Sequence, residues 1–585
     1  MPAAMIRLLL AGCALLSCPT DAAFAQDAPP DIAGIWSGDL NPPGGKPLEM
    51  VFWIERDGDG WRGLVDTPPQ GAFGLPMKVT YRDGEFSMNV TATGGEYRAT
   101  LSEDGKQLDG DWLQRGAELD LVCTRRPPAP TIPESLRKAV VGTWEGPLAV
   151  GAVELRLVLA VELDEQGELQ GHMASPDQGK RTFPITRTDL VDDGYLRFCI
   201  GATFSTFTMA PADNGAELVG QYSQGGRSYD ITLQRVDKPT ERKRPQEPKP
   251  PFPYSSREVT YENEAAEVTL AGTLTIPEGE GPFPTALLIT GSGTQDRDET
   301  IFDHKPFWVL ADHLSRRGIA VLRVDDRGIG GSTTGPDPGA ATSADFAGDV
   351  LAGVAFLRAQ DEVDPERIGL IGHSEGGIIA PMVAAQSSDV AFIVLLAGTG
   401  IPGSEIVVMQ VELLSRATEP EEEVQKAVAL QRKLVDVVRD ASLSKAEIGD
   451  GIRAVLLDTA SEDGEEIGET RIKSTIEQLT NPWIRFFFAH DPAPVLEEVK
   501  CPVLAVCGTL DLQVPYEINL ETIGQALARG GNADYEVHAF EGLNHLFQHC
   551  ETGQVTEYGK IEETFAPEAL DYVTNWITKR FVERR

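Results

Sequence analysis

The sequence predicts two small all-β domains followed by an α/β domain, whose doubly wound and mainly parallel sheet carries a helical cap. Three observations support this fold class. A segment of short alternating strands occurs twice between residues 31 and 236. After residue 257, buried apolar strands alternate with amphipathic helices, which is typical of a parallel sheet covered on both faces. A mostly helical block at about 399–490 interrupts that alternation.

The composition indicates a globular, strongly acidic protein. The chain has 585 residues, of which 41% are hydrophobic, and this is enough to build buried cores. Its formal net charge is −39, and a chain this acidic repels phosphate backbones and anionic lipid surfaces. We therefore expect a small-molecule partner and no nucleic-acid partner.

Residues 1–25 are predicted to be a secretory signal peptide. Arg7 provides the positive start, "LLLAGCALL" the apolar run, and "AFA" ending at Ala25 a cleavage site of the A-x-A type. The run is too short to span a bilayer, and no later segment reaches that length, so no transmembrane span is expected. The prediction is export to a bacterial periplasm. The alternative is lipid anchoring at Cys18 or Cys13, each of which ends a stretch similar to a lipoprotein cleavage box.

The cysteines do not predict a disulfide framework. Five remain after cleavage at that site, which is an odd number. Cys501 and Cys507 flank one predicted strand, whose length of roughly 20 Å keeps them too far apart for a bridge. No Cys/His spacing is typical of a metal site, and neither metal nor cofactor is expected.

The two β domains are predicted at 31–126 and 139–236, and they repeat each other in order. "GIWSGDL" in the first corresponds to "GTWEGPL" in the second, and "GDWLQRGAELDL" corresponds to "GQYSQGGRSYDI". Asp-Gly pairs separate the apolar runs, which favours tight hairpins between antiparallel strands. We expect two small barrels or sandwiches, with Trp36 and Trp144 packed in their cores.

A proline-rich segment separates the β domains from the α/β domain. Residues 237–256, "DKPTERKRPQEPKPPFPYSS", have no apolar period and are predicted to form an extended linker. The α/β domain follows at 257–585, with strands such as "TALLITG", "IAVLRVDD", "RIGLIGHS" and "AFIVLLAG". The helical block either caps the site or packs beside the sheet, and one of its helices has a single apolar face formed by Val424, Ala427, Val428, Leu434, Val435 and Val438.

A serine lies between a buried strand and an apolar helix in "RIGLIGHSEGGIIAP". The run Gly372-His373-Ser374-Glu375-Gly376 fits the pattern G-x-S-x-G. At such a strand-to-helix turn, glycines allow the chain to turn sharply and to expose the serine hydroxyl. Ser374 is therefore the predicted nucleophile, and His373 is expected to shape the turn.

A nucleophilic serine needs a base, and the base needs an acid that orients it. His545 in "FEGLNHLFQ" and Asp511 in "VCGTLDLQVP" each follow a predicted strand, at the edge of the sheet where Ser374 is expected. His545 would take the proton from Ser374, and Asp511 would select the histidine tautomer. Three residues are weaker alternatives for the acid or the base: Asp534, His538 and His549.

Residues 257–585 resemble the α/β-hydrolase superfamily, on its bacterial serine esterase branch. The motifs "GSGTQDRD", "DDRGIGGS", "GHSEGG", "GTLDLQVP" and "GLNHLFQ" occur in the order of that branch. The resemblance implies Ser374 as nucleophile, Asp511 as acid and His545 as base, in the chain order of the superfamily. The repeated β units are similar to small domains found ahead of some bacterial hydrolases, which implies no activity for them.

Two backbone donors are expected to bind the oxyanion of the tetrahedral intermediate. The first is the N–H of Glu375, and the turn after "ALLIT" should supply the second. Many relatives have His-Gly in that turn, whereas this chain has Thr290-Gly291-Ser292-Gly293. By position, Ser292 or Gly293 is the expected donor.

The predicted function is an exported serine carboxylesterase that cleaves small or medium acyl esters through an acyl-enzyme on Ser374. Two alternatives stay open: a peptidase or amidase with the same triad, and an exported binding protein that works through its β domains. The aromatic run "NPWIRFFFAH", which holds Trp483 and Phe486 to Phe488, either lines an acyl pocket or belongs to the core.

Overall fold

The structure, a computed structural model, describes residues 30–583 apart from several short segments. These segments are 43–45, 59, 83, 115, 151–152, 177–180, 192–193, 214, 226, 241–242, 338, 441 and 464–466. The predicted signal peptide, with Cys13 and Cys18, lies outside the described residues. Among the helices of the described part, none is long and apolar enough to cross a membrane.

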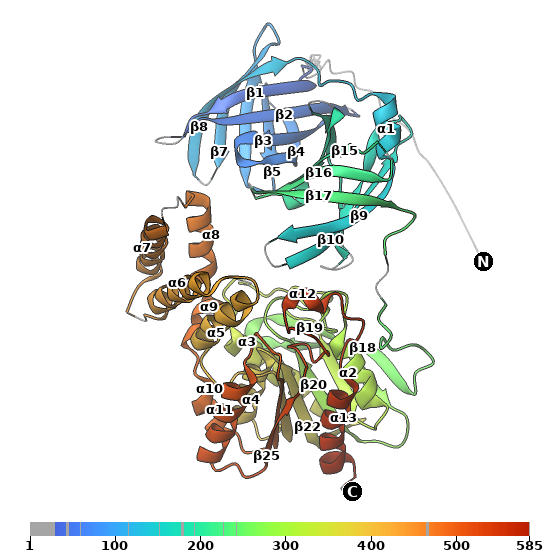
Figure 1. Cartoon of the computed structure of the whole chain (residues 1–585), viewed down its shortest axis with the longest axis vertical. Helices are drawn as coiled ribbons and strands as arrows, with labels where there is room; N and C mark the ends of the chain where they lie inside the picture. Colours follow the sequence, from blue (N-terminus) through green and yellow to red (C-terminus); the bar gives the residue numbers. More distant parts are fainter. Residues whose placement is uncertain are drawn as a thin grey trace, which may run out of the picture. The chain divides into compact units, whose positions relative to one another are not determined.

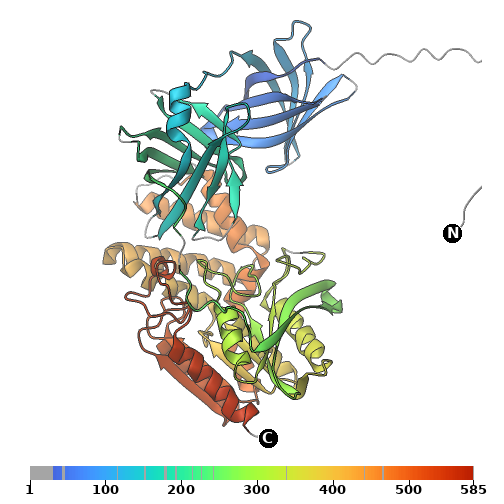
Figure 2. The same cartoon turned by 90° about the vertical axis from the view of Figure 1, so that its right-hand side faces the viewer.

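The first β domain is a closed antiparallel barrel (Figures 1 and 2, blue). Its strands are β1 (Gly34–Leu40), β2 (Leu48–Asp57), β3 (Gly60–Thr67), β4 (Ala72–Arg82), β5 (Glu85–Val90), β6 (Gly95–Leu101), β7 (Gln107–Gln114) and β8 (Ala117–Arg126). Successive side chains of a strand point to opposite faces, so that aromatic residues fill the interior: Trp36, Phe52, Phe86 and Tyr97. β1 pairs with both β2 and β8, which closes the barrel.

The second β domain begins with a short helix, α1 (Glu134–Val140), and continues as one nine-stranded sheet. Its strands are β9 (Gly142–Val150), β10 (Val153–Leu163), β11 (Leu169–Ala174), β12 (Thr182–Pro184), β13 (Arg187–Leu190), β14 (Leu196–Ile200), β15 (Ser205–Pro211), β16 (Glu217–Gln224) and β17 (Arg227–Val236). Their spatial order is β12-β11-β10-β9-β17-β16-β15-β14-β13. An all-β region therefore precedes the α/β domain, as predicted.

Equivalent contacts relate the two β domains to each other. The indole N–H groups of Trp36 and Trp144 each donate to a backbone carbonyl four residues earlier, at 2.8 and 2.7 Å. Both side chains are fully buried, which confirms the prediction that they belong to the cores. Arg125 lies 4.3 Å from the ring centroid of Trp36, and Arg235 lies 4.0 Å from that of Trp144. The repeat in the sequence is thus also a repeat of side-chain contacts.

The C-terminal domain is built on an eight-stranded sheet with the order β18-β19-β21-β20-β22-β23-β24-β25. The strands are β18 (Tyr254–Asn263), β19 (Val268–Pro277), β20 (Phe283–Ile289), β21 (Ala320–Val324), β22 (Val363–His373), β23 (Phe392–Leu396), β24 (Val503–Gly508) and β25 (Tyr535–Phe540). β18 and β19 pair antiparallel, and all neighbours from β21 to β25 are parallel. The first strand begins within the predicted linker.

Helices cover both faces of this sheet, which makes the fold doubly wound as predicted (Figure 1). On one face α2 (Pro306–Ser315) packs against α13 (Pro567–Ile577). The other face carries α3 (Ser343–Arg358), α4 (Gly376–Gln386), α10 (Pro492–Glu498) and α11 (Tyr516–Arg529). The inner strands β20, β21, β23 and β24 are almost completely buried, which explains their continuous apolar sequences.

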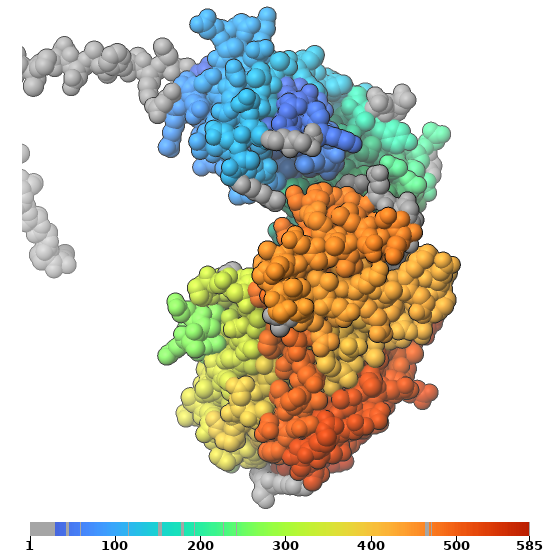
Figure 3. All heavy atoms as spheres, turned by 90° about the vertical axis from the view of Figure 1, so that its left-hand side faces the viewer, coloured from blue at the N-terminus to red at the C-terminus, as the bar shows by residue number. Residues whose placement is uncertain are grey.

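The block between β23 and β24 is helical, as predicted, and has a core of its own. It consists of α5 (Gly403–Arg416), α6 (Glu421–Arg439), α7 (Lys445–Asp463), α8 (Glu469–Leu479) and α9 (Pro482–Ala489). The apolar face predicted for α6 lies in this core, with Val424, Val428, Leu434, Val435 and Val438 buried. In Figure 3 the block, in orange, forms one continuous mass on the α/β domain. We refer to α5–α9 as the cap.

Part of the predicted linker is anchored to the α/β domain. Arg244 is buried, and its guanidinium donates to the carbonyl oxygens of Phe302 (2.8 Å) and Ile561 (3.1 Å). The side-chain oxygen of Gln246 accepts a hydrogen bond from the backbone N–H of Thr564 (2.6 Å). This half of the segment is therefore a packed strap, because its polar side chains supply partners for backbone groups of the domain.

Candidate active site

The predicted nucleophile lies on a strained turn between β22 and α4. Ser374 has a φ of 53°, in the left-handed region that a serine rarely adopts, and it is partly exposed between buried neighbours. The glycines of the turn allow this geometry, since a Cβ on Gly372 would lie 2.0 Å from the carbonyl oxygen of Gly376. A turn of this kind presents the serine hydroxyl above the carboxyl end of the sheet.

The predicted base and acid form a buried hydrogen-bonded pair. His545, which follows β25, places Nδ1 at 2.8 Å from Oδ2 of Asp511, which follows β24. Both side chains are buried. The other oxygen, Oδ1, accepts from the backbone N–H groups of Gln513 and Val514, both at 2.8 Å. The carboxylate is therefore held in one orientation, with Nδ1–H of His545 donating to it and Nε2 left for other chemistry.

Three loops converge at Ser374. A Cβ on Gly291, in the turn after β20, would lie 3.3 Å from Cβ of Ser374, so that this turn lies directly against the predicted nucleophile. The ring of His373 packs 4.8 Å from the ring of His545, and His373 Nε2 donates to the backbone carbonyl of His545 at 3.0 Å. The structure thus brings three segments together: the turn at residues 372–376, which we call the elbow, the turn after β20, and the loop that carries His545, the predicted base.

The alternative acid and bases have partners elsewhere. Asp534 pairs with Arg580 at 3.3 Å. The ring of His538, inside β25, stacks on Tyr572 with 4.3 Å between centroids. His549 is exposed at the surface and pairs with two glutamates. None of these contacts involves Ser374 or the other members of the predicted triad.

The backbone N–H groups around Ser374 differ in whether they already donate a hydrogen bond. The N–H of Gly291 donates to the Glu299 carboxylate at 2.7 Å, so it is already satisfied. Among the described residues, the N–H groups of Ser292, Gly293 and Glu375 have no hydrogen-bond acceptor. Glu375 also precedes the first turn of α4, where the helix dipole favours negative charge. These are the donors predicted for the oxyanion, and their assignment stays a prediction.

The side chain of Glu375 connects the elbow to the cap, a contact that the sequence analysis missed. Its carboxylate accepts from Ser343 Oγ at 2.6 Å and from Trp483 Nε1 of α9 at 2.7 Å. Burial raises the pKa of this carboxyl above its usual value, although both hydrogen bonds oppose the shift. The position of this glutamate directly after the predicted nucleophile was the available clue in the sequence, but nothing in the sequence identified its partner.

Asp326, in the motif "DDRGIGGS", contacts the turn after β20. Asp326 accepts from Thr290 Oγ1 and from the backbone N–H of Gln295, both at 2.8 Å, so that it braces the turn after β20. Burial, together with the nearby carboxylates of Glu299 and Glu375, raises the pKa of Asp326 to about 7. Three carboxyl groups therefore surround this turn.

A cavity of about 590 Å³ lies between the cap and the loops of the α/β domain. Its apolar walls come from Ile329, Phe346, Trp483 and Ile484, and it reaches Gly293 of the turn after β20. The predicted aromatic run is divided between two surroundings. Trp483 lines the cavity, whereas Phe488 is buried in the core of the cap.

In the described part of the chain, no group of three or more His, Cys, Asp or Glu residues has the arrangement of a metal site. The five described cysteines, Cys501 and Cys507 among them, are free. Cys507 is buried, and its Sγ lies 3.5 Å from Oδ2 of Asp511, in contact with the predicted acid.

Comparison with known sequences agrees with the fold of the C-terminal domain. The model of the alpha/beta hydrolase family matches residues 286–555. The chain is 26% identical over 321 residues to esterase EstD of Thermotoga maritima, a match that covers 53% of this chain and 66% of EstD. It is also 32% identical over 115 residues to an uncharacterized protein of Mycobacterium tuberculosis, covering 20% of this chain and 36% of that protein.

Solved structures with a similar fold include two α/β enzymes. Esterase Pf2001 of Pyrococcus furiosus is 16% identical, with a TM-score of 0.35, and the match covers 59% of this chain and 99% of Pf2001. The alpha/beta hydrolase GrgF of Penicillium sp. sh18 is 16% identical, also with a TM-score of 0.35, over 56% of this chain and 99% of GrgF.

A parallel sheet of this order, with a serine turn after β22 and an acid and a histidine after the next strands, defines an α/β hydrolase. The family match covers the same part of the chain. The C-terminal domain of this protein has the α/β-hydrolase fold, its residues 286–555 match the model of that family, and an all-β region precedes it.

Proposed function

We propose that this protein is a serine hydrolase that cleaves carboxylic esters through an acyl-enzyme on Ser374. The observation that carries the proposal is the buried His545–Asp511 pair, which lies at the same edge of the sheet as the strained turn of Ser374. The family match and the identity to esterase EstD support a hydrolase.

In the proposed reaction, His545 Nε2 removes the proton of Ser374 Oγ as that oxygen attacks the ester carbonyl carbon. Asp511 stabilises the imidazolium that forms. The N–H of Glu375 and one N–H from the turn after β20 donate to the tetrahedral oxyanion. The imidazolium then protonates the leaving alcohol, and a water molecule repeats the sequence to release the acid and restore Ser374.

The surroundings of the site favour small or medium acyl groups. The cavity beside the turn after β20 has a volume of about 590 Å³ and largely apolar walls, which suits an aliphatic or aromatic chain.

A p-nitrophenyl ester series from acetate to decanoate, with wild type and Ser374→Ala, tests the proposal. We expect turnover by the wild type and a loss in kcat of about 10⁴-fold or more in the variant, with unchanged thermal unfolding. A fluorophosphonate probe should label only the wild type. If the variant keeps most of the activity, Ser374 is not the nucleophile. Faster cleavage of matched anilides than of esters would favour a peptidase or amidase.

We also propose export to a bacterial periplasm, on the basis of the signal-like residues 1–25. Cell fractionation and N-terminal sequencing of the mature protein test this proposal. A mature chain that starts at Gln26 is expected. A lipid-modified start at Cys18 or Cys13 would indicate the anchored alternative, and an uncleaved chain in the cytoplasmic fraction would contradict export.

A further inference from the structure

A chain of buried hydrogen bonds joins the three loops that meet at Ser374. Glu299 Oε1 accepts from the N–H of Gly291 at 2.7 Å and lies 2.8 Å from Nδ1 of His373. The other ring nitrogen of His373, Nε2, contacts the carbonyl oxygen of His545 at 3.0 Å. Glu299 and His373 are 1% and 5% exposed. One carboxylate and one imidazole therefore link the turn after β20, the elbow and the loop of the base.

The hydrogen-bond partners constrain the protons of His373. Nε2 must carry a proton, because a carbonyl oxygen only accepts. Nδ1 lies within hydrogen-bonding distance of Glu299 Oε1, the same oxygen that accepts from Gly291. Burial by itself lowers the pKa of His373, but the charge and the hydrogen bond of Glu299 outweigh it, so that the pKa is raised. The raised pKa favours the doubly protonated ring, in which Nδ1 donates to Glu299 and Nε2 donates to the carbonyl oxygen of His545.

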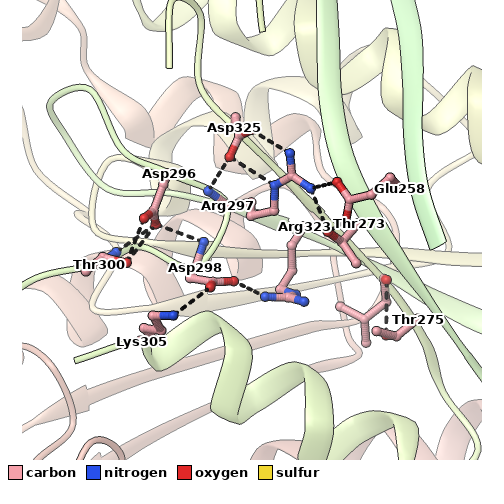
Figure 4. Close-up of polar contacts among 11 residues, drawn as sticks. Glu258, Thr273, Thr275, Asp296, Arg297, Asp298, Thr300, Lys305, Arg323 and Asp325 are labelled. Atoms are coloured by element: carbon pink, nitrogen blue, oxygen red, sulfur yellow. Dashed lines mark hydrogen bonds and ion pairs between the residues drawn. The ribbon is translucent and has the colours of Figure 1, made fainter. Parts of the chain in front are cut away.

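The residues that flank Glu299 in the sequence make ion pairs and hydrogen bonds with the rest of the domain (Figure 4). Arg297 donates to both oxygens of Asp325, at 3.0 and 2.6 Å, and also pairs with Glu258. Asp298 pairs with Arg323.

The same stretch turns sharply just before Glu299. Asp296 accepts from the backbone N–H groups of Asp298 and Thr300, both at 3.0 Å. Glu299 itself has a φ of 53°, a conformation that persists in a non-glycine residue only where its surroundings enforce it. The carboxylate therefore projects from a backbone that is fixed on both sides.

We propose that Glu299 and His373 act as a positioning pair, which fixes the turn after β20 and the loop of His545 relative to Ser374. This inference rests on the proposed function of Ser374 and His545, and it assigns no chemical step to the pair. A shift of about 1 Å in either loop would misplace a donor or the base, and misplacement of this size costs on the order of 100-fold in rate.

The substitution Glu299→Gln tests whether the pair needs the charge of Glu299, because glutamine has almost the same shape as glutamate but is neutral. A neutral His373 carries only one ring proton, so it cannot donate to both the side chain at position 299 and the carbonyl of His545. If Nδ1 donates to the amide oxygen of the substituted side chain, the lone pair of Nε2 faces the carbonyl oxygen of His545 and the loop of the base is released. If Nε2 donates to His545 instead, the amide must turn its NH₂ group toward Nδ1, and the bond from Gly291 is lost.

The kinetic test uses the full-length chain with Glu299→Gln, His373→Gln and the double variant. We expect each single variant to lose about 10- to 100-fold in kcat, with KM within about threefold of wild type. The double variant should be no worse than the more severe single variant, because the two residues act through each other. Asp312→Asn, which alters a partly buried pair with Arg316 on α2, is the control and should keep its kcat. A Glu299→Gln enzyme within twofold of wild type, or losses that multiply, would overturn the proposal.

A second measurement applies to the wild type and does not depend on how the variants fold. With ¹⁵N-labelled histidine, one of the eight imidazoles should show two slowly exchanging ring N–H groups at pH 8. His373→Gln assigns this signal. A singly protonated His373 at pH 8 would overturn the pair. Failure of the proposed function has a different signature, namely a wild type that neither hydrolyses esters nor reacts with fluorophosphonate.

Discussion

Ser374 and Glu299 both have a φ of 53°, although neither is glycine. A residue held in this region costs roughly 1–3 kcal/mol, which the surrounding structure must offset. The end of β22 and the start of α4 flank Ser374, and Glu299 follows Arg297 and Asp298, which form ion pairs with Asp325 and Arg323. At the residue scale, these two strained residues lie where the proposed chemistry needs fixed positions.

The assignment of the base can be tested with two histidines that lie four residues apart. His545 is buried against Asp511, whereas His549 is exposed and paired with surface glutamates. We expect His545→Ala to lower kcat on an activated ester by about 10³- to 10⁴-fold, and His549→Ala to leave it nearly unchanged. Steady-state kinetics of both variants decide this, and a damaging His549→Ala would transfer the role of base.

The raised pKa of Asp326 predicts a pH-dependent stability. Burial raises this pKa from 3.8 to about 7, so the folded protein binds the proton more tightly than the unfolded chain does. The contribution of the protonated carboxyl to stability is therefore lost as the pH rises from 3.8 to about 7.

The substitution Asp326→Asn removes this ionisation and can keep the hydrogen bonds to Thr290 and Gln295. We expect the difference in the free energy of unfolding, variant minus wild type, to increase as the pH rises, by at most about 1.4 kcal/mol per pH unit. Urea unfolding between pH 4.5 and 8 measures the difference. Two curves that stay parallel over this range would contradict the prediction.

At the scale of elements, α9 of the cap is tied to the elbow through one side chain. Trp483 donates to Glu375 at 2.7 Å and stacks on Phe487, with 5.3 Å between ring centroids and an angle of 4° between the planes. The same indole lines the cavity of about 590 Å³. The cap therefore acts on the site in two separable ways, through a hydrogen bond to a buried carboxyl and through the size of a cavity wall.

Two substitutions of Trp483 separate these effects. Trp483→Phe keeps an aromatic wall but removes the N–H donor, so we expect a loss in stability of about 1–3 kcal/mol with an unchanged preference for acyl length. Trp483→Ala also enlarges the cavity, and it should shift the best p-nitrophenyl ester to a longer chain. Thermal unfolding and the ester series measure both. An unchanged chain-length preference in Trp483→Ala would mean that the cavity does not hold the acyl group.

At the scale of the whole molecule, the segment before the α/β domain is part of that domain's packing. Arg244 donates to the carbonyl oxygens of Phe302 and Ile561, which are far apart in sequence, and Gln246 bonds to Thr564. The strap thus joins the loop that carries Glu299 to the loop before α13. A flexible, fully solvated linker would not provide these contacts.

The substitution Arg244→Ala should therefore destabilise the full-length protein. It leaves two partly buried carbonyl groups without this donor, and we expect a loss of about 2 kcal/mol or more in the free energy of unfolding. Lys249→Ala, an exposed cation in the same segment, is the matched control and should change it by less than about 0.5 kcal/mol. Denaturant unfolding measures both, and equal effects would show that the strap does not stabilise the domain.

The sequence predicted the fold class and the residues that follow strand ends, because both depend on local patterns. Strand and helix periods identified the doubly wound sheet, and G-x-S-x-G after a buried strand identified Ser374. The roles of Ser374, Asp511 and His545 stay predictions, although the structure brings the acid and the histidine together. The sequence did not identify Glu299, because nothing in its motif distinguished it from the neighbouring acidic residues.

The sequence by itself determined the set of elements and their order along the chain, because hydrophobic periodicity and turn residues depend on only a few neighbouring residues in the sequence. Only the tertiary structure decided which polar side chains meet. Glu299 reaches His373, Glu375 reaches Trp483, and Arg244 reaches Ile561 across long stretches of sequence. The physical reason is that a buried charge is tolerated only with a partner, and folding, rather than spacing along the chain, supplies that partner.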